Sequence, residues 1–513
     1  MGDAAKTIVL LAVVAAAVIT GAAFRPKTPA TPEAAHVPSD TPPVESYGND
    51  FAGLKYAAVR LSPGNAVLLG SLDQTAQQHQ MRMVWNPDDH RASYTLTGSH
   101  SVLSFPEEWS LPVEATLPDS AFSHGWVDSA ELSGAAVTKE RLAEDLAAVK
   151  VHRLVDENRT RRFVVPFFSD QTVHDRHVLA TEIAHGNRVS VYLVENDESA
   201  FHQDRSEAIK VAVEVASEII RRCEGRVLDF VEAQLGAITD LDDDGRLTFV
   251  MGHLSEHGFN HRNEQPITGC VRPDDFLKHA VPNGSVHTGG DIVYLDCSLP
   301  DGEELDAVLA HELTHAATFC VVRESECLES CSLPGWLNEA IAHYVEYRIN
   351  PRSENLKHRL ADFTRQPHRF PLVIPDSVQQ LSLRRGPARA AACLFLLSTL
   401  QQMPADSLRT MICRPESGTQ RLESIAGEVF PEIFRNWGLQ SMASQRDFPR
   451  WDFCDSGERD LHLAGTAFTW TAPVVKSGTL EIFAPVESDL QITVVKSPMP
   501  RVADVQDRAR QVQ

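Results

Sequence analysis

The first region with a clear hydrophobic pattern is built from short alternating runs. Residues 81–85 (MRMVW) and 93–97 (SYTLT) alternate apolar and polar side chains, and Pro, Gly and Asn-Pro signals separate such runs. This period of two is typical of half-buried strands connected by turns. The pattern predicts a β-rich N-terminal domain over residues 51–160.

The pattern then changes to strands and helices in alternation. Residues 189–194 (VSVYLV) predict a strand, and residues 206–222 predict an amphipathic helix with Ile209, Val213, Ala216 and Ile220 on one face. Gly225 predicts the end of that helix. Residues 289–296 predict another strand. We expect a second domain over residues 161–445.

A longer helix is predicted over residues 303–319. This stretch contains no Pro and no Gly, and its apolar stripe is formed by Leu305, Val308, Leu309, Leu313 and Ala316. Such a stripe is typical of a helix packed against a core. Beyond residue 350 the sequence becomes helical again, over residues 387–401 and 422–437.

The C-terminal part returns to strand alternation. Residues 479–483 and 490–494 predict a small β-rich appendage over residues 455–497, followed by a tail at 498–513. The complete pattern predicts an α+β protein, in which a central domain is flanked by a β-rich N-terminal domain and a small β appendage.

The N-terminus has the residue pattern of a targeting signal. Lys6 precedes an apolar run at residues 7–20, and small residues follow at 21–23. This order predicts a signal peptide or a signal anchor over residues 1–23. Residues 24–50 are rich in Pro, Ala, Thr and Glu and predict a disordered linker. We expect an exported protein, in contact with a membrane only if the N-terminal segment stays as an anchor.

Composition and charge narrow the choice of partners. The chain has 513 residues, 43% of them hydrophobic, which is enough for two to four domains. The net charge is −23, and no basic run occurs. Because binding to a phosphate backbone needs clustered Lys and Arg, we expect no nucleic-acid partner.

The predicted helix at 303–319 contains candidate metal ligands and a candidate general base. His311 and His315 stand four residues apart with Glu312 between them. On a helix, positions i and i+4 lie about 40° apart around the axis, so both imidazoles can reach one metal ion. Glu312 points to one side, where it can act as general base toward an attacking water. The alternative is a buried helix with two hydrogen-bonded core histidines.

A catalytic zinc ion needs a third protein ligand, and residues 333–344 offer one in the run WLNEA at 336–340. The pairing of His311-Glu-x-x-His315 with this run resembles the gluzincin zinc metallopeptidases over residues 162–443. The resemblance implies a zincin-type catalytic domain with a helical lower subdomain, and it implies that His311, His315 and Glu339 bind Zn2+ and Glu312 is catalytic.

Two features depart from the family pattern. The gap between His315 and Glu339 is longer than usual, and His343 stands where many members have an acidic residue that orients a zinc-bound histidine. Glu346, Asp296 or Asp306 could take that role, because such partners normally fix the orientation of a ligand.

The nine cysteines all lie between Cys223 and Cys454. In an exported protein they are expected to pair mostly in disulfides, with at least one left over. Cys320, Cys327 and Cys331 fall in the long gap after His315, where a cystine would pin the insert. A zinc-thiolate site is the alternative.

Two further groups suggest metal binding. Asp240, Asp242 and Asp244, with Gly245, match the first half of an EF-hand loop, although Met251 stands where a bidentate glutamate is needed. The turn resembles one in hyicolysin-like secreted neutral metallopeptidases. It predicts either a weak Ca2+ site or a solvated acidic turn. The second group, His253, His257 and His261, is expected to form a polar loop.

The resulting hypothesis is an exported zinc metallopeptidase that acts on proteins or peptides. The Gly-x-Met-Glu-Asn segment of the aminopeptidase branch is absent, which favours an endopeptidase. By resemblance, the strand at 289–296 is expected to form the edge that aligns the substrate, and the alternative is an ordinary sheet strand. Tyr344, Tyr347 and His343 are candidates for oxyanion stabilisation. The alternatives are an aminopeptidase and a catalytically silent binding protein of the same fold.

Overall fold

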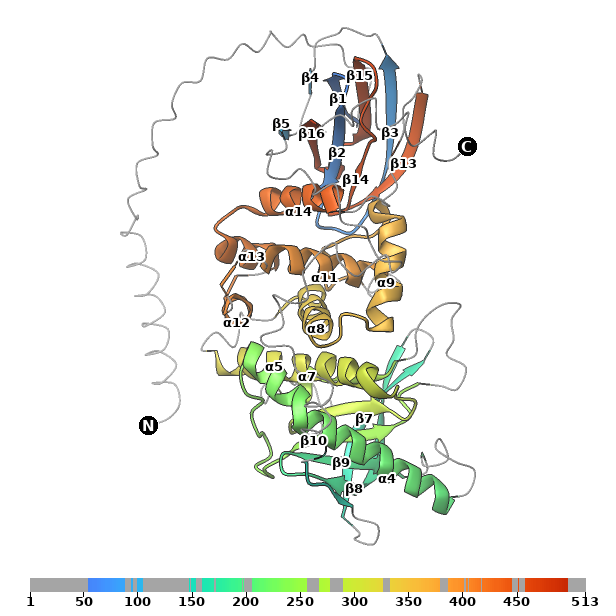
Figure 1. Cartoon of the computed structure of the whole chain (residues 1–513), viewed down its shortest axis with the longest axis vertical. Coiled ribbons are helices and arrows are strands. Elements are labelled where there is room, and N and C mark those ends of the chain that lie inside the picture. Colours follow the sequence, from blue (N-terminus) through green and yellow to red (C-terminus); the bar gives the residue numbers. More distant parts are fainter. Residues whose placement is uncertain are drawn as a thin grey trace, which may run out of the picture. The chain divides into compact units, whose positions relative to one another are not determined.

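The computed structural model describes residues 54–496, with gaps at 88–93, 96–98, 105–146, 154–158, 170–171, 198–204, 256–266, 277–288, 326–332, 379–385, 445–450 and 452–456 and at a few isolated positions. The described part contains three β-sheets and a series of helices (Figure 1). The predicted α+β class is confirmed at this level. The expected N-terminal signal segment (1–23), linker (24–50) and C-terminal tail (498–513) lie outside the described residues.

Two of the sheets form a β-sandwich. One has the strand order β13-β3-β15-β1-β4 and the other β14-β2-β16-β5. The strands are β1 (Leu54–Leu61), β2 (Asn65–Ser71), β3 (Gln78–Pro87), β4 (Tyr94–Thr95), β5 (Ser99–Ser104), β13 (Gly457–Ala464), β14 (Phe468–Trp470), β15 (Gly478–Pro485) and β16 (Leu490–Lys496). Buried side chains from both sheets, such as Met83 and Ile482 from one and Val67 and Val494 from the other, share one hydrophobic core.

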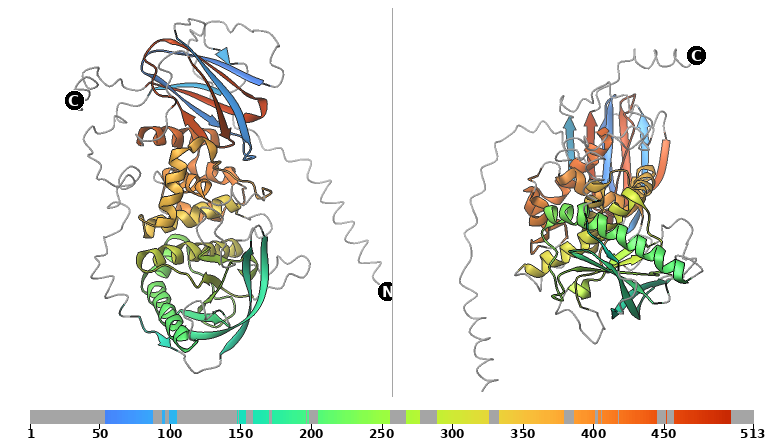
Figure 2. Two further views of the ribbon diagram at one scale, coloured as in Figure 1. Left: turned by 90° about the vertical axis from the view of Figure 1, so that its right-hand side faces the viewer. Right: turned by 60° about the horizontal axis from the view of Figure 1, so that its bottom comes forward.

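The sandwich draws its strands from both ends of the described chain. β1 pairs antiparallel with β15, and β2 pairs antiparallel with β16. Figure 2 shows the blue N-terminal strands interleaved with the red C-terminal ones. The expectation of a separate domain at 51–160 and a separate appendage at 455–497 is therefore wrong. Each segment alone leaves strand edges unpaired and an apolar face uncovered, and pairing removes both costs.

The third sheet has the order β11-β12-β10-β9-β8-β6, with β7 also paired to β8. Its strands are β6 (His152–Arg153), β7 (Thr160–Ser169), β8 (Thr172–His185), β9 (Val189–Val194), β10 (Leu247–Gly252), β11 (Gly269–Val271) and β12 (Ile292–Asp296). β9, β10 and β12 run parallel, and β11 is antiparallel to β12. β12 is thus an interior strand, and the expectation that residues 289–296 form the edge is wrong. β11 is the last strand of the described order.

Helices cover this sheet. α4 (Arg205–Arg222) contacts β8 and β9, and its chain continues through a π-helical turn (Cys223–Val227) into α5 (Leu228–Leu235). The predicted helix at 206–222 is confirmed, but Gly225 lies within the π-helical turn and does not end the helical segment. The long helix α7 (Gly302–Glu324) packs on α5 and carries the His-Glu-x-x-His segment. It is long and apolar enough to span a membrane, but most of it is buried inside the fold.

A helical subdomain follows α7. It comprises α8 (Gly335–Ile349), α9 (Glu354–Arg365), α11 (Pro387–Leu400), α12 (Ser407–Ile412), α13 (Gly418–Ala426) and α14 (Phe430–Ser444). α8 packs between α7 and α11. The predicted stretch at 422–437 is split by Gly427, whose φ of 70° ends α13. Trp437 of α14 contacts Phe468 of β14, with ring centroids 4.6 Å apart, which joins the helices to the β-sandwich.

The described cysteines contradict the expected disulfides. Cys223, Cys270, Cys297, Cys320, Cys393 and Cys413 are all free thiols. Cys223, Cys320 and Cys393 are buried in the main hydrophobic core, where a free cysteine behaves as a small apolar side chain. Cys327, Cys331 and Cys454 lie outside the described residues.

Candidate metal centre

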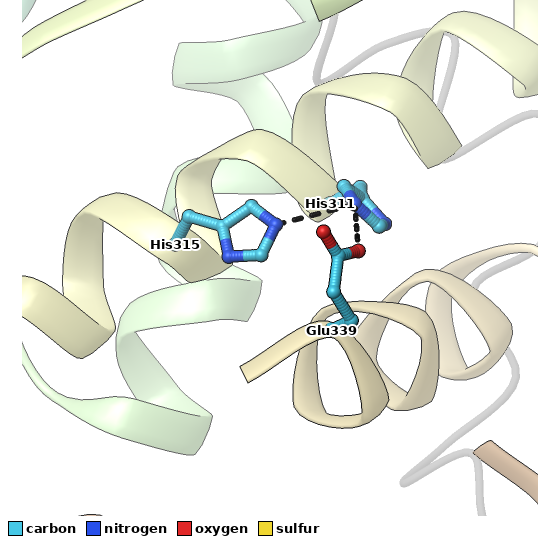
Figure 3. A group of neighbouring side chains, drawn as sticks. All are labelled: His311, His315 and Glu339. Carbon is cyan, nitrogen blue, oxygen red and sulfur yellow. Dashed lines mark hydrogen bonds and ion pairs between the residues drawn. The ribbon is translucent and has the colours of Figure 1, made fainter. Parts of the chain in front are cut away.

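The centre begins on α7, where the helical repeat brings two imidazoles together. His311 and His315 are both buried, and their Nε2 atoms lie 3.3 Å apart (Figure 3). If both rings are neutral, these two Nε2 atoms can be hydrogen-bonded to each other only when one carries a proton and donates it to the other. A cation between the two nitrogens would satisfy both at once.

Glu339 completes the group from the second turn of α8. Its Oε2 lies 3.6 Å from His311 Nε2, and the three ligand atoms of His311, His315 and Glu339 all lie within 4.8 Å of one another. In a tetrahedral zinc site with bonds of about 2.0–2.1 Å, neighbouring ligand atoms are about 3.3 Å apart. The measured separations of 3.3 and 3.6 Å fit that geometry. Glu339 Oε2 is buried and accepts no hydrogen bond, which leaves it available as a ligand.

Glu346 holds His311 from the opposite side. Its Oε2 lies 3.1 Å from His311 Nδ1 and 2.7 Å from His343 Nδ1, while its Oε1 accepts hydrogen bonds from Ser353 and Asn355. If Nδ1 of His311 donates to this carboxylate, its Nε2 is left with a lone pair directed at the ligand group. Of the three acids named from the sequence, Glu346 is therefore the one placed to orient His311, and it lies three residues beyond His343.

The other two candidates for that role are engaged elsewhere. Asp306 forms ion pairs with Arg222 and Arg226, each at 3.0 Å. Asp296 accepts hydrogen bonds from the backbone of Leu254 and from Ser298. Glu346, His311 and His343 could also be considered as a metal site, because their ligand atoms lie close together. However, Glu346 already accepts hydrogen bonds at both oxygens, so the orienting role fits better.

Charges in the centre favour a bound cation. Burial opposes protonation of His311, but the contacts of its imidazole with Glu339 and Glu346 outweigh this effect and raise the pKa of His311 to about 10. Burial also opposes ionisation of Glu339, yet Arg389 and His311 hold its pKa well below the usual value. Burial lowers the pKa of His315 to about 4. The centre thus keeps the carboxylates of Glu339 and Glu346 ionised and favours positive charge at His311, where a divalent cation can replace a proton.

Glu312 stands beside the ligand group without belonging to it. It is buried, and its Oε2 has no hydrogen-bond partner. Burial raises the pKa of its carboxyl to about 7, with opposition from His311. A carboxyl with this pKa can both accept and release a proton near neutral pH. The backbone of Gly269 approaches it so closely that a Cβ there would lie 2.7 Å from Glu312 Cγ.

A cavity of about 750 Å3 opens over these groups. Residues 267–271, which include β11, line one wall, and β11 has no second neighbour in the described sheet order. The facing wall includes Asn355, His358, Arg359 and Asp362, which share one face of α9. A free strand edge beside the candidate base gives an extended peptide a backbone to pair with.

The expected oxyanion donors are not all at the centre. Tyr344 and Tyr347 do not line the cavity; Tyr344 packs in the main core, and its hydroxyl accepts a hydrogen bond from Arg348. His343 does line the cavity, but its Nδ1 is engaged by Glu346. Its role in oxyanion stabilisation stays a prediction.

Arg389 is a residue of the centre that the sequence analysis missed. Its Nη2 lies 2.7 Å from Glu339 Oε1, and its side chain lines the cavity. A signal for it exists, because Arg389 is the one charged residue in the apolar run 387–400. Buried charges are normally paired, so an isolated cation in such a helix indicates a partner carboxylate.

The acidic turn has a different composition from the one predicted. Asp240 and Asp242 group with Asp291, whereas Asp244 accepts a hydrogen bond from the backbone of Arg246 instead. The Arg161 guanidinium lies 2.7 Å from Asp242 and already supplies a positive charge there. The Ca2+ expectation for Asp240, Asp242 and Asp244 therefore stays a prediction.

The histidine-rich segment is described only at its start. His253 follows β10 in a non-helical stretch, while His257 and His261 lie outside the described residues. The expected loop conformation of this segment can therefore be checked only at His253.

Comparison with known proteins does not identify a family for this chain or a role for the candidate metal centre. No family model matches the sequence, and no curated protein matches it.

Proposed function

We propose that this protein is a zinc-dependent metallopeptidase and that it cleaves within peptide chains. The observation that carries the proposal is the ligand geometry: His311 Nε2 lies 3.3 Å from His315 Nε2 and 3.6 Å from Glu339 Oε2, two separations that fit a tetrahedral zinc site, and all three ligand atoms lie within 4.8 Å of one another. The buried Glu312 carboxylate stands beside them with a free oxygen. The gluzincin-like sequence pattern supports the proposal, under which the mixed sheet, α7 and the helical subdomain after it would form a zincin-type catalytic domain.

His311, His315 and Glu339 would hold the metal. Bound there, zinc would supply Lewis acidity, which makes a water molecule more acidic and polarises the scissile carbonyl. Glu312 takes the proton from the attacking water and passes it to the leaving amine. Glu346 orients His311, and Arg389 positions Glu339 through their ion pair.

The substrate is a polypeptide in an extended conformation. The strand edge at residues 269–271 offers backbone groups to it, and the cavity runs from this edge to α9. Among the described lining residues, the one acidic residue away from the centre is Asp362, which is paired with Arg365. Apart from Glu312 and Glu339, which already have roles in the proposed centre, no buried carboxylate among these described lining residues is free to capture an amino terminus, which favours an endopeptidase over an aminopeptidase.

Export is part of the proposal and rests on the N-terminal residues 1–23. The free thiols of the described cysteines do not add to it, because an oxidising compartment would favour disulfides.

Hydrolysis of unfolded casein by the zinc-loaded full chain tests the activity. Wild type should cleave it, and Glu312→Gln should lose at least about 100-fold in kcat/KM while it retains its zinc, since a positioned proton-transfer group contributes about 10²–10⁴-fold. Glu303→Gln is the matched control, because Glu303 is an exposed residue of the same helix. A folded, zinc-containing wild type that cleaves nothing would refute the peptidase proposal and favour a binding protein.

A further inference from the structure

A third histidine lies at the metal centre, and the proposed mechanism does not use it. His343 stands on α8 four residues after Glu339 and three residues before Glu346. These spacings place the three side chains on one face of the helix, and α8 packs on α7. His343 is completely buried, with an exposed fraction of 0%. α8 therefore presents a candidate ligand, an imidazole and an orienting carboxylate to the helix that carries His311.

His343 and His311 contact the same oxygen atom of Glu346. Nδ1 of His343 lies 2.7 Å from Glu346 Oε2, and Nδ1 of His311 lies 3.1 Å from it. Because an ionised carboxylate can only accept hydrogen bonds, each Nδ1 carries a proton and donates a hydrogen bond to this oxygen. The shorter contact makes His343 the closer partner of Oε2.

The ring of His343 also packs against the ring of His311. Their centroids lie 4.6 Å apart, and the ring planes are inclined by 60°. Because buried side chains are closely packed, the His311 ring cannot turn about its Cβ–Cγ bond without displacing the neighbouring ring. His343 therefore constrains the candidate ligand in two ways, through this contact and through the carboxylate that both rings share.

The other oxygen of Glu346 is held by residues that follow α8. Oε1 accepts hydrogen bonds from Ser353 Oγ at 2.8 Å and from Asn355 Nδ2 at 3.2 Å. Asn355 Nδ2 also lies 3.5 Å from Oε2, which is at the limit of a hydrogen bond. Removal of the His343 imidazole would leave Oε1 held and would deprive Oε2 of its closest partner. The effect should thus fall on the oxygen that orients His311.

Stability alone does not account for an imidazole at this position. Nε2 of His343 is buried and has no hydrogen-bond partner among the described residues. A buried polar atom without a partner opposes folding, whereas an apolar side chain would carry no such cost. The donor at Nδ1 is the feature that an apolar side chain could not supply.

We propose that His343 is a positioning residue of the metal centre: it fixes the carboxylate of Glu346, which in turn holds His311 with its Nε2 directed at the metal. This inference rests on the proposed function and adds to it a residue that acts on zinc through Glu346.

Zinc competition with a chromophoric chelator, applied to the full chain, provides the test. His343→Leu removes the donor and should weaken zinc binding about 10-fold, the lower end of the effect of partners that orient a ligand. His343→Asn places an amide NH2 donor close to the position of Nδ1 and should bind zinc within about threefold of wild type. Circular dichroism establishes that both variants are folded.

Val345→Ala is the matched control, because Val345 is a buried residue of the same helix that does not line the cavity. It should lower the melting temperature and leave the zinc affinity unchanged. A double-mutant cycle with Glu346→Gln then tests the route of the effect. If His343 acts through Glu346, His343→Leu should weaken zinc binding less than about threefold in the Glu346→Gln background.

Three results would overturn the inference: His343→Leu that binds zinc as tightly as wild type, His343→Asn that binds zinc as weakly as His343→Leu, or the whole loss of about 10-fold in the Glu346→Gln background. These affinities do not depend on cleavage. A wild type that binds zinc but cleaves nothing would therefore refute the peptidase proposal alone, and the affinities would still decide the role of His343. A wild type that binds no zinc would overturn both.

Discussion

Glu346 offers the sharpest prediction about the architecture of the centre. Its carboxylate is buried and is hydrogen-bonded to four residues, two of which are His311 and His343. Burial opposes its ionisation, but the two histidines together hold its pKa well below the usual value. Glu346→Gln keeps the shape of the side chain and removes the charge.

The magnitude follows from these contacts. Two charge-assisted hydrogen bonds, each contributing about 1.5–3 kcal/mol, become neutral bonds of about 1 kcal/mol. The expected loss of folding stability is about 1–4 kcal/mol. Because the carboxylate no longer holds His311 with its Nε2 toward the other ligands, zinc affinity should fall about 10- to 100-fold.

Zinc competition with a chromophoric chelator measures the affinity, and a thermal melt followed by circular dichroism measures the stability. Glu354→Gln is the control, because Glu354 is an exposed residue of α9 whose carboxylate pairs with Lys357 and His358, away from the centre. If folded Glu346→Gln binds zinc within about twofold of wild type, Glu346 does not orient His311 and the account of this contact is wrong.

Three further predictions concern neighbouring groups. Gly269→Ala places a Cβ 2.7 Å from Glu312 Cγ and should lower kcat more than about 10-fold with zinc content unchanged; an unaltered kcat would mean that the contact does not matter. Arg389→Gln removes the ion pair with Glu339 and should lower kcat/KM about 10-fold or more in steady-state kinetics. An unchanged kcat/KM would mean that the ion pair does not position Glu339. Burial raises the pKa of Asp291 to about 7, above its ordinary value of 3.8, so its contribution to stability is greatest below pH 4 and is lost as pH rises toward 7. At pH 8, Asp291→Asn should therefore have a higher melting temperature than wild type, with a gain in the free energy of unfolding of at most about 4 kcal/mol. At pH 4 the two proteins should melt alike. Equal shifts at both pH values would contradict a raised pKa at Asp291.

That the three candidate ligands lie together could be predicted from the sequence. The spacing of His311 and His315 places both on one face of a helix whatever surrounds it. Glu339 came from a sequence resemblance, and the structure brings it to the two histidines. Glu346 could only be named as one of several acids, since its distance from His311 depends on how α8 packs on α7.

The pairing of strands from distant segments could not be predicted from the hydrophobic periodicity of the sequence. An alternating pattern shows that a segment is a strand but does not identify its neighbour. Val67 and Thr471 are hydrogen-bonded although they stand 404 positions apart, so the single β-sandwich could not be inferred from either end alone. The same limit applies to β11, whose pairing with β12 makes residues 269–271, and not 289–296, the edge at the centre.

The expected disulfides failed for a related reason. Cysteine pairing was inferred from export and from the number of thiols, neither of which specifies distance. In the described part of the chain, Cys223, Cys320 and Cys393 lie in separate helical segments and remain free.

Metal content tests the central claim most directly. The purified full chain, equilibrated with a slight excess of zinc and then desalted, should retain about one zinc ion per chain by mass spectrometry of the metal, whereas His315→Ala and Glu339→Ala should retain little. X-ray absorption at the zinc edge should report two imidazole nitrogens. A folded wild type without zinc, or variants with the same zinc content as wild type, would contradict the assignment of His311, His315 and Glu339.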